Sequence, residues 1–229
     1  MGERSAVYER FVAALARPPE SVPLDEAALC IAAHADPSVD VDAYLTRIDD
    51  LAGEVRTPTL DGLVRHLYSS GRYLGNTDDY YDPRNSLLHE VLDRRLGIPI
   101  TLAVLGMEVG RRIGVPLSGV GMPGHFLVRD KVDPSVFIDP FHAGRELDAA
   151  GCRALHRAMA GPSAPWDPGY LDPIERPAIV ARILANLRVI YQRSNQIDSL
   201  RWAVKLRCAM PGASAEDRQE LVRLMAPLN

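Results

Sequence analysis

A histidine and an aspartate on either side of a predicted turn have the types and spacing that chemistry requires. His125 follows a Pro-Gly pair and begins an apolar run, and Asp139 ends a second apolar run. The residues between these runs, 130–135, are turn-forming, which is the pattern of a β-hairpin. In a hairpin centred on Val132, His125 faces Asp139, and opposed side chains have Cβ atoms about 4.5–5.5 Å apart. An imidazole held by a carboxylate at that distance is typical of catalytic His/Asp pairs.

A nucleophile would complete such a pair, and the first turn of a helix is where one is commonly activated. The helix expected before the hairpin begins near Ile98 and extends to about Arg112, and it contains no cysteine. Thr101 is the nearest hydroxyl, with His125 as the evident base. A threonine at this position also satisfies free backbone N–H groups, so a structural role is the alternative. Asn85 is a candidate to orient a catalytic group, and it also fits a helix cap.

Cys152 is a second candidate nucleophile. It follows Asp139 in a run that also contains Leu147 and Leu155. A lone cysteine in an apolar stripe is usually a small core residue, so packing is the alternative role for this thiol.

The histidines do not show the spacing of a metal-binding motif. We therefore predict no metal site, and we predict no cofactor. A two-histidine site formed by His125 and His142 is the alternative, because His142 closely follows Asp139 in the chain.

The composition is that of an ordinary globular protein. The 229 residues are 47% hydrophobic and 24% charged, with a formal net charge of −4. Nucleic-acid-binding proteins usually carry a basic face, so no nucleic-acid partner is predicted. The longest apolar stretch, 98–109, is far shorter than the roughly 20 residues that span a bilayer, and no membrane association is predicted. Three widely spaced cysteines form no disulfide framework, which indicates a cytoplasmic location.

The first 77 residues are predicted to form a helical layer. Asp40 can cap one helix and Thr59 the next. The first of these helices has apolar residues at close to ideal helical spacing, namely Val41, Tyr44, Leu45, Ile48, Leu51, Ala52 and Val55. We expect this layer, 1–77, to pack against a core that extends over 78–160.

The predicted core contains two helices before the hairpin. Asn85 or Ser86 can cap the first, and Gly97 can end it. The second, 102–113, is apolar on nearly all sides and should be the buried central helix. Its charged residues Glu108 and Arg111 are spaced so that they can pair.

A segment rich in Pro and Gly, 160–169, separates this core from a helical extension over 176–229. The extension has the pattern of one helical hairpin and part of a second. Helical repeat units usually need about three copies to be stable alone. We therefore expect this short extension to dock on the core.

Three motifs occur in the order that one family shows. They are Tyr80-Tyr81-Asp82-Pro83-Arg84-Asn85-Ser86, Arg94-x-x-Gly97-Ile98-Pro99-Ile100-Thr101-Leu102 and Gly119-Val120-Gly121-Met122-Pro123-Gly124-His125-Phe126-Leu127-Val128-Arg129. With these motifs the chain resembles the bacterial SirB-type proteins, over roughly Leu60 to Tyr191. The resemblance implies an α+β, transglutaminase-like (papain-like) core followed by tetratricopeptide-like helices. It also implies that His125 and Asp139 are the second and third members of a Cys-His-Asp triad, whose cysteine position falls at 99–101.

A His/Asp pair without that cysteine argues against classical cysteine-dependent transglutaminase or protease activity. We expect a bacterial cytoplasmic protein that binds a peptide or protein partner, either in the cleft at the pair or on the C-terminal helices. The alternative is a hydrolase or acyltransferase that uses Thr101 or Cys152 with His125 and Asp139. A mainly structural module within a larger assembly is a third hypothesis.

Overall fold

The N-terminal part of the chain is helical in the computed structural model, which describes residues 2–226. Its helices are α1 (Gly2–Leu15), α2 (Leu24–Ala35), α3 (Val41–Gly53) and α4 (Leu60–Val64), the last continued by a π-helical turn over Arg65–Ser69. Two predicted caps are confirmed. Asp40 accepts hydrogen bonds from the first backbone N–H groups of α3, and Thr59 accepts one from Gly62 in α4.

The segment that follows differs in detail from the prediction. A 3-10 turn (Pro83–Ser86) precedes α5 (Leu88–Arg94). Asp82, rather than Asn85 or Ser86, caps that turn through Arg84 N–H, and α5 has no side-chain cap. Helix α5 ends at Arg95, which adopts a left-handed conformation with φ of 60°. Gly97 does not end the helix, because it lies in β2 (Leu96–Gly97), which pairs in parallel with β1 (Leu74–Gly75).

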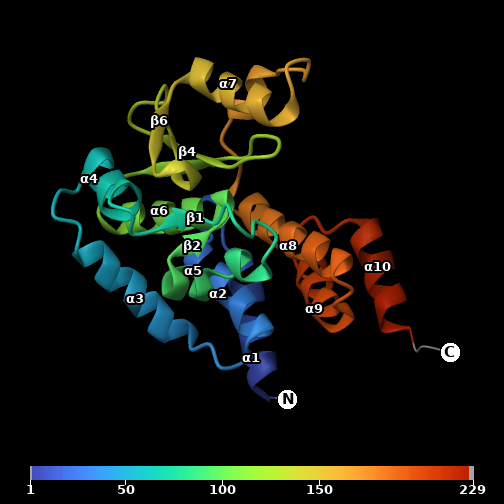
Figure 1. Ribbon diagram of the computed structural model, residues 1–229. Coiled ribbons are helices and arrows are strands. Elements are labelled where there is room, and N and C mark those ends of the chain that lie inside the picture. The colour runs from blue at the N-terminus through green and yellow to red at the C-terminus, as the bar shows by residue number, and fades with distance from the viewer. Residues whose placement is uncertain (1, 227–229) are drawn as a thin grey trace.

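Helix α6 (Pro99–Arg112) is the buried centre of the fold. Twelve of its residues are buried, as the apolar character on all its sides predicts. Figure 1 shows α6 between the N-terminal helices and a four-stranded antiparallel sheet in the order β3-β4-β5-β6. The strands are β3 (Leu117–Val120), β4 (Leu127–Asp130), β5 (Phe137–Asp139) and β6 (Arg145–Leu147).

Alternate residues of the sheet face two different apolar clusters. Val128 and Ile138 belong to the large core around α6, whereas Leu127 and Phe137 belong to a smaller cluster. The smaller cluster includes Cys152 from α7 (Ala149–Ala160), which covers the outer face of the sheet (Figure 1). The sheet is therefore covered on both faces, with the two-residue period of a strand deciding which side chain faces which cluster.

The hairpin of β4 and β5 is present, but the predicted register is wrong. Val128 pairs with Ile138 and Arg129 with Phe137, which centres the hairpin on Asp133 rather than Val132. Continuing this register would place Asp139 opposite Leu127, so His125 is its diagonal neighbour instead of its direct partner. A shift of two positions keeps side chains on the same face, whereas a shift of one would reverse them.

The C-terminal part contains three helices, α8 (Arg176–Arg193), α9 (Ile197–Cys208) and α10 (Ala215–Met225). Helix α8 contacts α2 and α9, and its residues Ile183 and Leu187 are buried in the large core. The chain reaches α8 along the edge of the sheet, where Ile174 N–H donates to the Gly119 carbonyl at 3.0 Å. These helices and the N-terminal helices thus pack into one apolar cluster.

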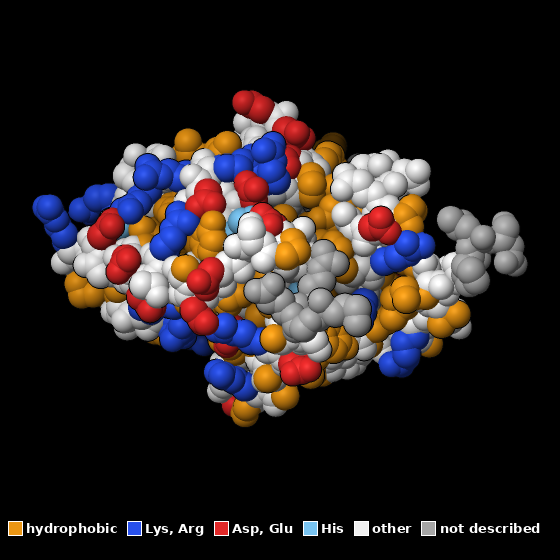
Figure 2. All heavy atoms as spheres, turned by 90° about the horizontal axis from the view of Figure 1, so that it is seen from below, with side chains coloured by type: hydrophobic (Ala, Val, Ile, Leu, Met, Phe, Trp, Pro, Cys, Tyr) orange, Lys and Arg blue, Asp and Glu red, His pale blue; other side chains and the backbone are white. Residues whose placement is uncertain are grey.

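The surface formed largely by the N-terminal helices carries both signs of charge. Figure 2 shows Lys and Arg side chains interspersed with Asp and Glu on this face. Among residues 2–226, no helix has the combined length and apolarity needed to cross a membrane.

A buried carboxylate lies in the middle of the apolar core. Glu108 of α6 has no exposed surface and forms ion pairs with three arginines, Arg111 and Arg112 of its own helix and Arg176 of α8. Burial and the nearby charge of Asp25 raise the pKa of Glu108, while Arg176 and Arg111 act in the opposite direction. The carboxylate thus links the central helix to the start of the C-terminal helices.

Replacing the buried Glu108 by Ala removes the carboxylate that Arg111, Arg112 and Arg176 share, and it leaves the mostly buried Arg176 without an ion-pair partner among the described residues. We expect Glu108→Ala to lower the free energy of unfolding by about 3–5 kcal/mol, the cost of breaking a buried ion pair on one side. Urea denaturation followed by circular dichroism measures the change. Glu216→Ala, at an exposed helical position of α10, is the control and should change stability by about 0.5 kcal/mol or less. Equal effects of the two substitutions would contradict the role assigned to Glu108.

Candidate functional site

His125 lies in a tight turn between β3 and β4. Gly124 supplies the turn with a φ of +76°, and His125 N–H donates to the Met122 carbonyl at 3.0 Å. Arg182 of α8 donates hydrogen bonds to the carbonyl oxygens of both Met122 and His125, at 2.9 and 2.8 Å. The position of the imidazole is therefore fixed from two directions, by the glycine turn and by the C-terminal helix.

Asp139 ends β5 and is completely buried. Its Oδ1 atom lies 2.9 Å from His125 Nε2, and its Oδ2 atom lies 2.6 Å from His142 Nδ1. The Asp139-Pro-Phe-His142 sequence forms a 3-10 turn in which Asp139 also accepts a hydrogen bond from His142 N–H. The two side chains of the predicted pair are thus in contact, and His142, the histidine of the alternative two-histidine site, joins them.

The two histidines differ in exposure. Only 4% of the His125 side chain is exposed, compared with 46% of the His142 side chain. Burial by itself would raise the pKa of Asp139, but the hydrogen bonds and charges of His125 and His142 hold it below the ordinary carboxyl value. The carboxylate is therefore an ionised, buried group, and His142 is the partner whose imidazole is exposed at the surface.

Thr101 has partners other than His125. Its hydroxyl is buried, donates to the Asn85 carbonyl at 2.7 Å and accepts from Ile98 N–H at 3.2 Å. The hydroxyl thus satisfies a free N–H group at the start of α6, which is the structural role. A catalytic role for Thr101 stays a prediction, and no hydrogen bond joins Thr101 to His125 in the described part of the chain.

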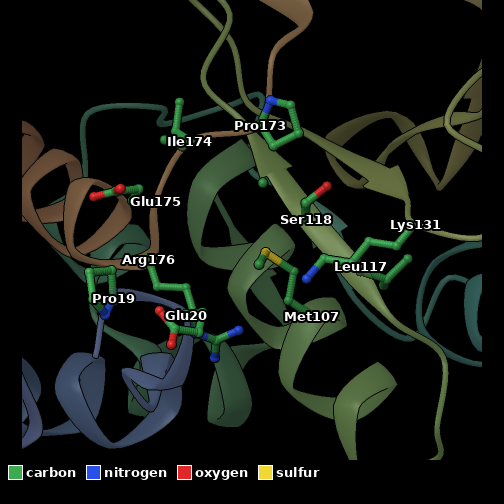
Figure 3. A pocket seen from close by; sticks show the side chains of 11 residues that line it. Pro19, Glu20, Met107, Leu117, Ser118, Lys131, Pro173, Ile174, Glu175 and Arg176 are labelled. Carbon is green, nitrogen blue, oxygen red and sulfur yellow. The ribbon is translucent and has the colours of Figure 1, made fainter. Parts of the chain in front are cut away.

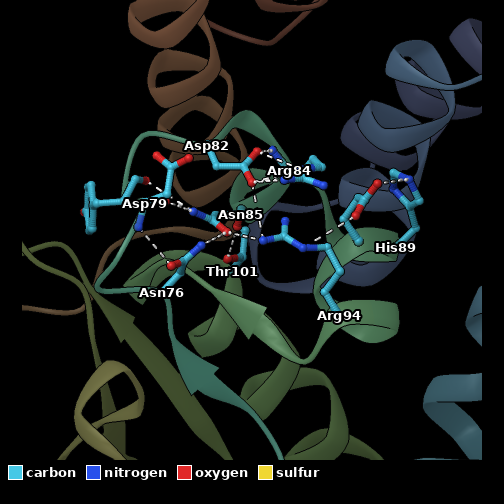
Figure 4. Close-up of polar contacts among 10 residues, drawn as sticks. Asn76, Asp79, Asp82, Arg84, Asn85, His89, Arg94 and Thr101 are labelled. Carbon is cyan, nitrogen blue, oxygen red and sulfur yellow. Dashed lines mark hydrogen bonds and ion pairs between the residues drawn. The ribbon is translucent and has the colours of Figure 1, made fainter.

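Asn85 is the centre of a second network, shown in Figure 4. Its Nδ2 donates to the Asp79 carbonyl at 2.7 Å, and its Oδ1 accepts from Asn76 at 3.0 Å and from Arg94 at 3.4 Å. These bonds fasten the loop before the 3-10 turn to α5. Asn85 therefore uses both ends of its amide to hold this loop, and a role in orienting His125 stays a prediction.

The cysteine thiols lie in unreactive surroundings. Cys152 packs in the apolar cluster under α7, where burial, with the charges of Asp148 and Asp139, raises its pKa to about 11. Burial raises the pKa of Cys30 to about 12, and it also raises that of Cys208. A thiolate is the nucleophilic form of cysteine, so all three residues are held in the poorly reactive form near neutral pH.

Residues that were not predicted complete the surroundings of the pair. Phe141 packs edge-on against His125 and His142, with ring centroids 6.1 and 5.3 Å away. Tyr80 packs against Phe141 at 5.9 Å and against Tyr81 at 5.4 Å. The three-residue interval from Asp139 to His142 was a sequence signal for the second histidine, whereas nothing in the sequence placed Tyr80 beside Phe141.

A separate pocket of about 340 Å³ lies beside β3, an edge strand of the sheet. Figure 3 shows Met107, Leu117 and Lys131 on one side of this pocket and Glu20 and Arg176 on the other. It is lined by residues from α6, β3 and the start of α8, and it includes none of the three residues of the His/Asp cluster.

Comparisons with known proteins agree with this core. A sequence model of the Transglutaminase-like superfamily matches residues 40–185. A UPF0162 protein of Xylella fastidiosa is 40% identical over 203 residues, which is 83% of this chain and 70% of the relative. A UPF0162 protein of Pseudomonas aeruginosa is 31% identical over 210 residues, 88% of this chain and 72% of the relative. F-box only protein 21 of Mus musculus is 38% identical over 112 residues, 44% of this chain and 18% of that protein. No solved structure matches the chain.

The role of the Thr101 hydroxyl can be tested through stability. Thr101→Val keeps the shape but leaves the Asn85 carbonyl and the Ile98 N–H without a partner, so we expect a loss of about 1–3 kcal/mol in the free energy of unfolding. Thr101→Ser retains the hydroxyl and should restore most of this loss. Chemical denaturation of the two variants checks the prediction, and a Thr101→Val protein as stable as the wild type would exclude the structural role.

Proposed function

We propose a function on the premise of the family, since this chain belongs to the Transglutaminase-like superfamily and has UPF0162 proteins among its relatives. The proposed function is to bind a peptide or protein partner at the His125–Asp139–His142 cluster, without thiol-dependent acyl transfer. The observation that carries the proposal is the combination of an intact imidazole–carboxylate pair with a helix start that offers no thiol. The buried Thr101 hydroxyl occupies that start, hydrogen-bonded to backbone groups.

Exposed aromatic side chains beside the cluster support partner binding. Tyr80 and Tyr81 are 38% and 57% exposed, and Tyr80 contacts Phe141, which packs on both histidines. Tyrosine and arginine are enriched in protein interfaces, where they contribute much of the binding energy. The aromatic surface of Tyr80, Tyr81 and Phe141 is therefore the part of this region best suited to a partner.

Two arginines indicate the chemistry of that partner. The Arg193 guanidinium lies over the Tyr81 ring, 5.1 Å from its centroid. Arg182 donates to two carbonyl oxygens, and no carboxylate of the described residues forms an ion pair with it. Burial lowers the pKa of Arg182, which reflects the cost of keeping a cation there without an anion. We accordingly propose a partner segment that carries an acidic group.

The finer features implied by the family resemblance belong to the same proposal. They are a papain-like arrangement of the core, membership in the SirB-type group, a tetratricopeptide-like character of the C-terminal helices and a cytoplasmic location. The packing of α8 against α9, and of α9 against α10, supports a helical surface that gives the partner a second contact.

A second candidate function rests on the His125–Asp139 contact. An imidazole hydrogen-bonded to a buried carboxylate at 2.9 Å has the geometry of a catalytic base. A hydrolase or acyltransferase would need Thr101 or Cys152 to reach that imidazole. Under this alternative, His125→Ala abolishes turnover while the far-ultraviolet circular dichroism spectrum stays unchanged.

Peptide binding is tested with a ligand selected on the protein itself. Random peptides displayed on phage are enriched on the immobilised full chain, and an enriched peptide is titrated by fluorescence polarisation. We expect Tyr81→Ala to weaken binding at least about tenfold, because loss of an aromatic interface anchor costs more than about 1.4 kcal/mol. Val132→Ala removes a hydrophobic side chain that is 77% exposed in the hairpin turn, and it should leave affinity unchanged. Enriched peptides that bind Tyr81→Ala as tightly as wild type would contradict the proposed surface.

Independence from thiols requires a separate measurement. The full chain is assayed for incorporation of a fluorescent primary amine into a glutamine-containing protein, before and after alkylation with iodoacetamide. We expect the wild type to incorporate no more amine than the protein in which Cys30, Cys152 and Cys208 are all replaced by Ala. Incorporation that is lost in Cys152→Ala, with the circular dichroism spectrum retained, would favour the acyltransferase alternative instead.

A further inference from the structure

Three side chains with metal-binding atoms meet at Asp139. His125 comes from the turn before β4, Asp139 from the end of β5, and His142 from the 3-10 turn that follows β5. One ligand atom from each residue can be chosen so that all three lie within 4.8 Å of one another. Each histidine presents a ring nitrogen to a different oxygen of the same carboxylate, at 2.9 and 2.6 Å.

We propose that His125, Asp139 and His142 bind one divalent transition-metal ion of the first row. Two imidazoles and one carboxylate are the donors typical of zinc, iron, cobalt and nickel sites, whereas calcium and magnesium prefer oxygen ligands. The partner is proposed to bind at this same cluster, but we infer the ion from the donor atoms alone, so its binding does not depend on the partner.

The geometry needs only a small adjustment to hold such an ion. Zinc–ligand bonds of about 2.0–2.2 Å place the ligand atoms of a tetrahedral site about 3.4 Å apart. The two histidine nitrogens lie 2.9 and 2.6 Å from different oxygens of the carboxylate, so these contacts open slightly on coordination, and one ligand atom from each residue lies within 4.8 Å of the others. His142, with nearly half of its side chain exposed, is the ligand with room to move.

The protonation states are compatible with coordination. A neutral imidazole carries its proton on one ring nitrogen and leaves the other free to bind a metal. His125 Nε2 and His142 Nδ1 face Asp139, and each can bind the ion when the proton sits on the other nitrogen of its ring. The hydrogen bonds to Asp139 are then replaced by three bonds to a shared cation.

The burial pattern is that of a site with one open side. Asp139 and His125 are buried, while His142 lies at the surface, so an ion can reach the carboxylate along the His142 side. The Phe141 ring packs on both imidazoles and limits their rotation. Three protein ligands leave at least one coordination position for water or for a group of a bound ligand.

The test uses the full chain, produced without a histidine tag and freed of metal by a chelator. Co²⁺ is titrated and followed by visible absorption, and Zn²⁺ affinity is measured by competition with a chromophoric chelator. We expect one equivalent of either ion to bind, and we expect Zn²⁺ to raise the thermal unfolding temperature. His142→Ala and Asp139→Asn should each weaken binding more than about tenfold, since substitutions of mere outer-shell residues already cost 10- to 100-fold.

A matched variant controls for unspecific binding by histidine. His66→Ala removes a histidine that contacts Arg72 instead of the cluster, and it should keep the wild-type affinity and stoichiometry. Circular dichroism establishes that each variant is folded, and His142→Ala removes a half-exposed side chain, which limits its effect on the fold. Wild-type protein that binds less than one equivalent at micromolar concentrations would overturn the proposal. Affinity that is unchanged in His142→Ala would overturn it as well.

Discussion

A central helix that is apolar on nearly all sides must be covered on those sides, and this constraint organises the whole chain. Helix α6 is contacted by α2, α3 and α4, by the sheet, and by α8. Burial of apolar surface is the main favourable contribution to folding, so each of these elements stabilises the fold by covering part of the helix. The sheet, the N-terminal helices and the C-terminal helices therefore contribute side chains to one core.

The same core contains two deeply buried carboxylates with different surroundings. Glu108 lies in α6 among arginines and links this helix to α8 by charge. Asp139 has two imidazoles as partners, which are weaker and titratable cations. An arginine network stabilises a fixed arrangement, since the guanidinium remains charged at all ordinary pH values. Imidazoles can instead bind a metal or take part in proton transfer, so Asp139 is the carboxylate on which we base the proposals.

The part of the chain that matches the family contains the candidate site. The family match over 40–185 includes α3, the sheet and the first part of α8, and it therefore includes His125, Asp139 and His142. It also includes Arg182, which holds the His125 turn from α8. Helix α8 thus contributes to the position of the candidate site through Arg182, although the site residues themselves come from the sheet region.

The sequence by itself determined the elements whose signals are local. The apolar character of 102–113 predicted a buried helix, Asp40 and Thr59 predicted helix starts, and turn residues around 130–135 predicted a hairpin. The absence of cysteine from the start of α6 was also a property of sequence alone. Each of these features depends on residues close together in the chain, so periodicity and capping chemistry suffice to identify them.

Only the tertiary structure decided which side chains meet. The hairpin is centred one residue later than predicted, and His125 is positioned by the Gly124 turn and by Arg182 instead of by direct pairing with Asp139. The second imidazole on Asp139, the backbone partners of Thr101 and the use of Asn85 as a loop clamp all depend on packing between distant segments. Such contacts are set by how the sheet and helices pack on α6, and no local pattern encodes the distances between them.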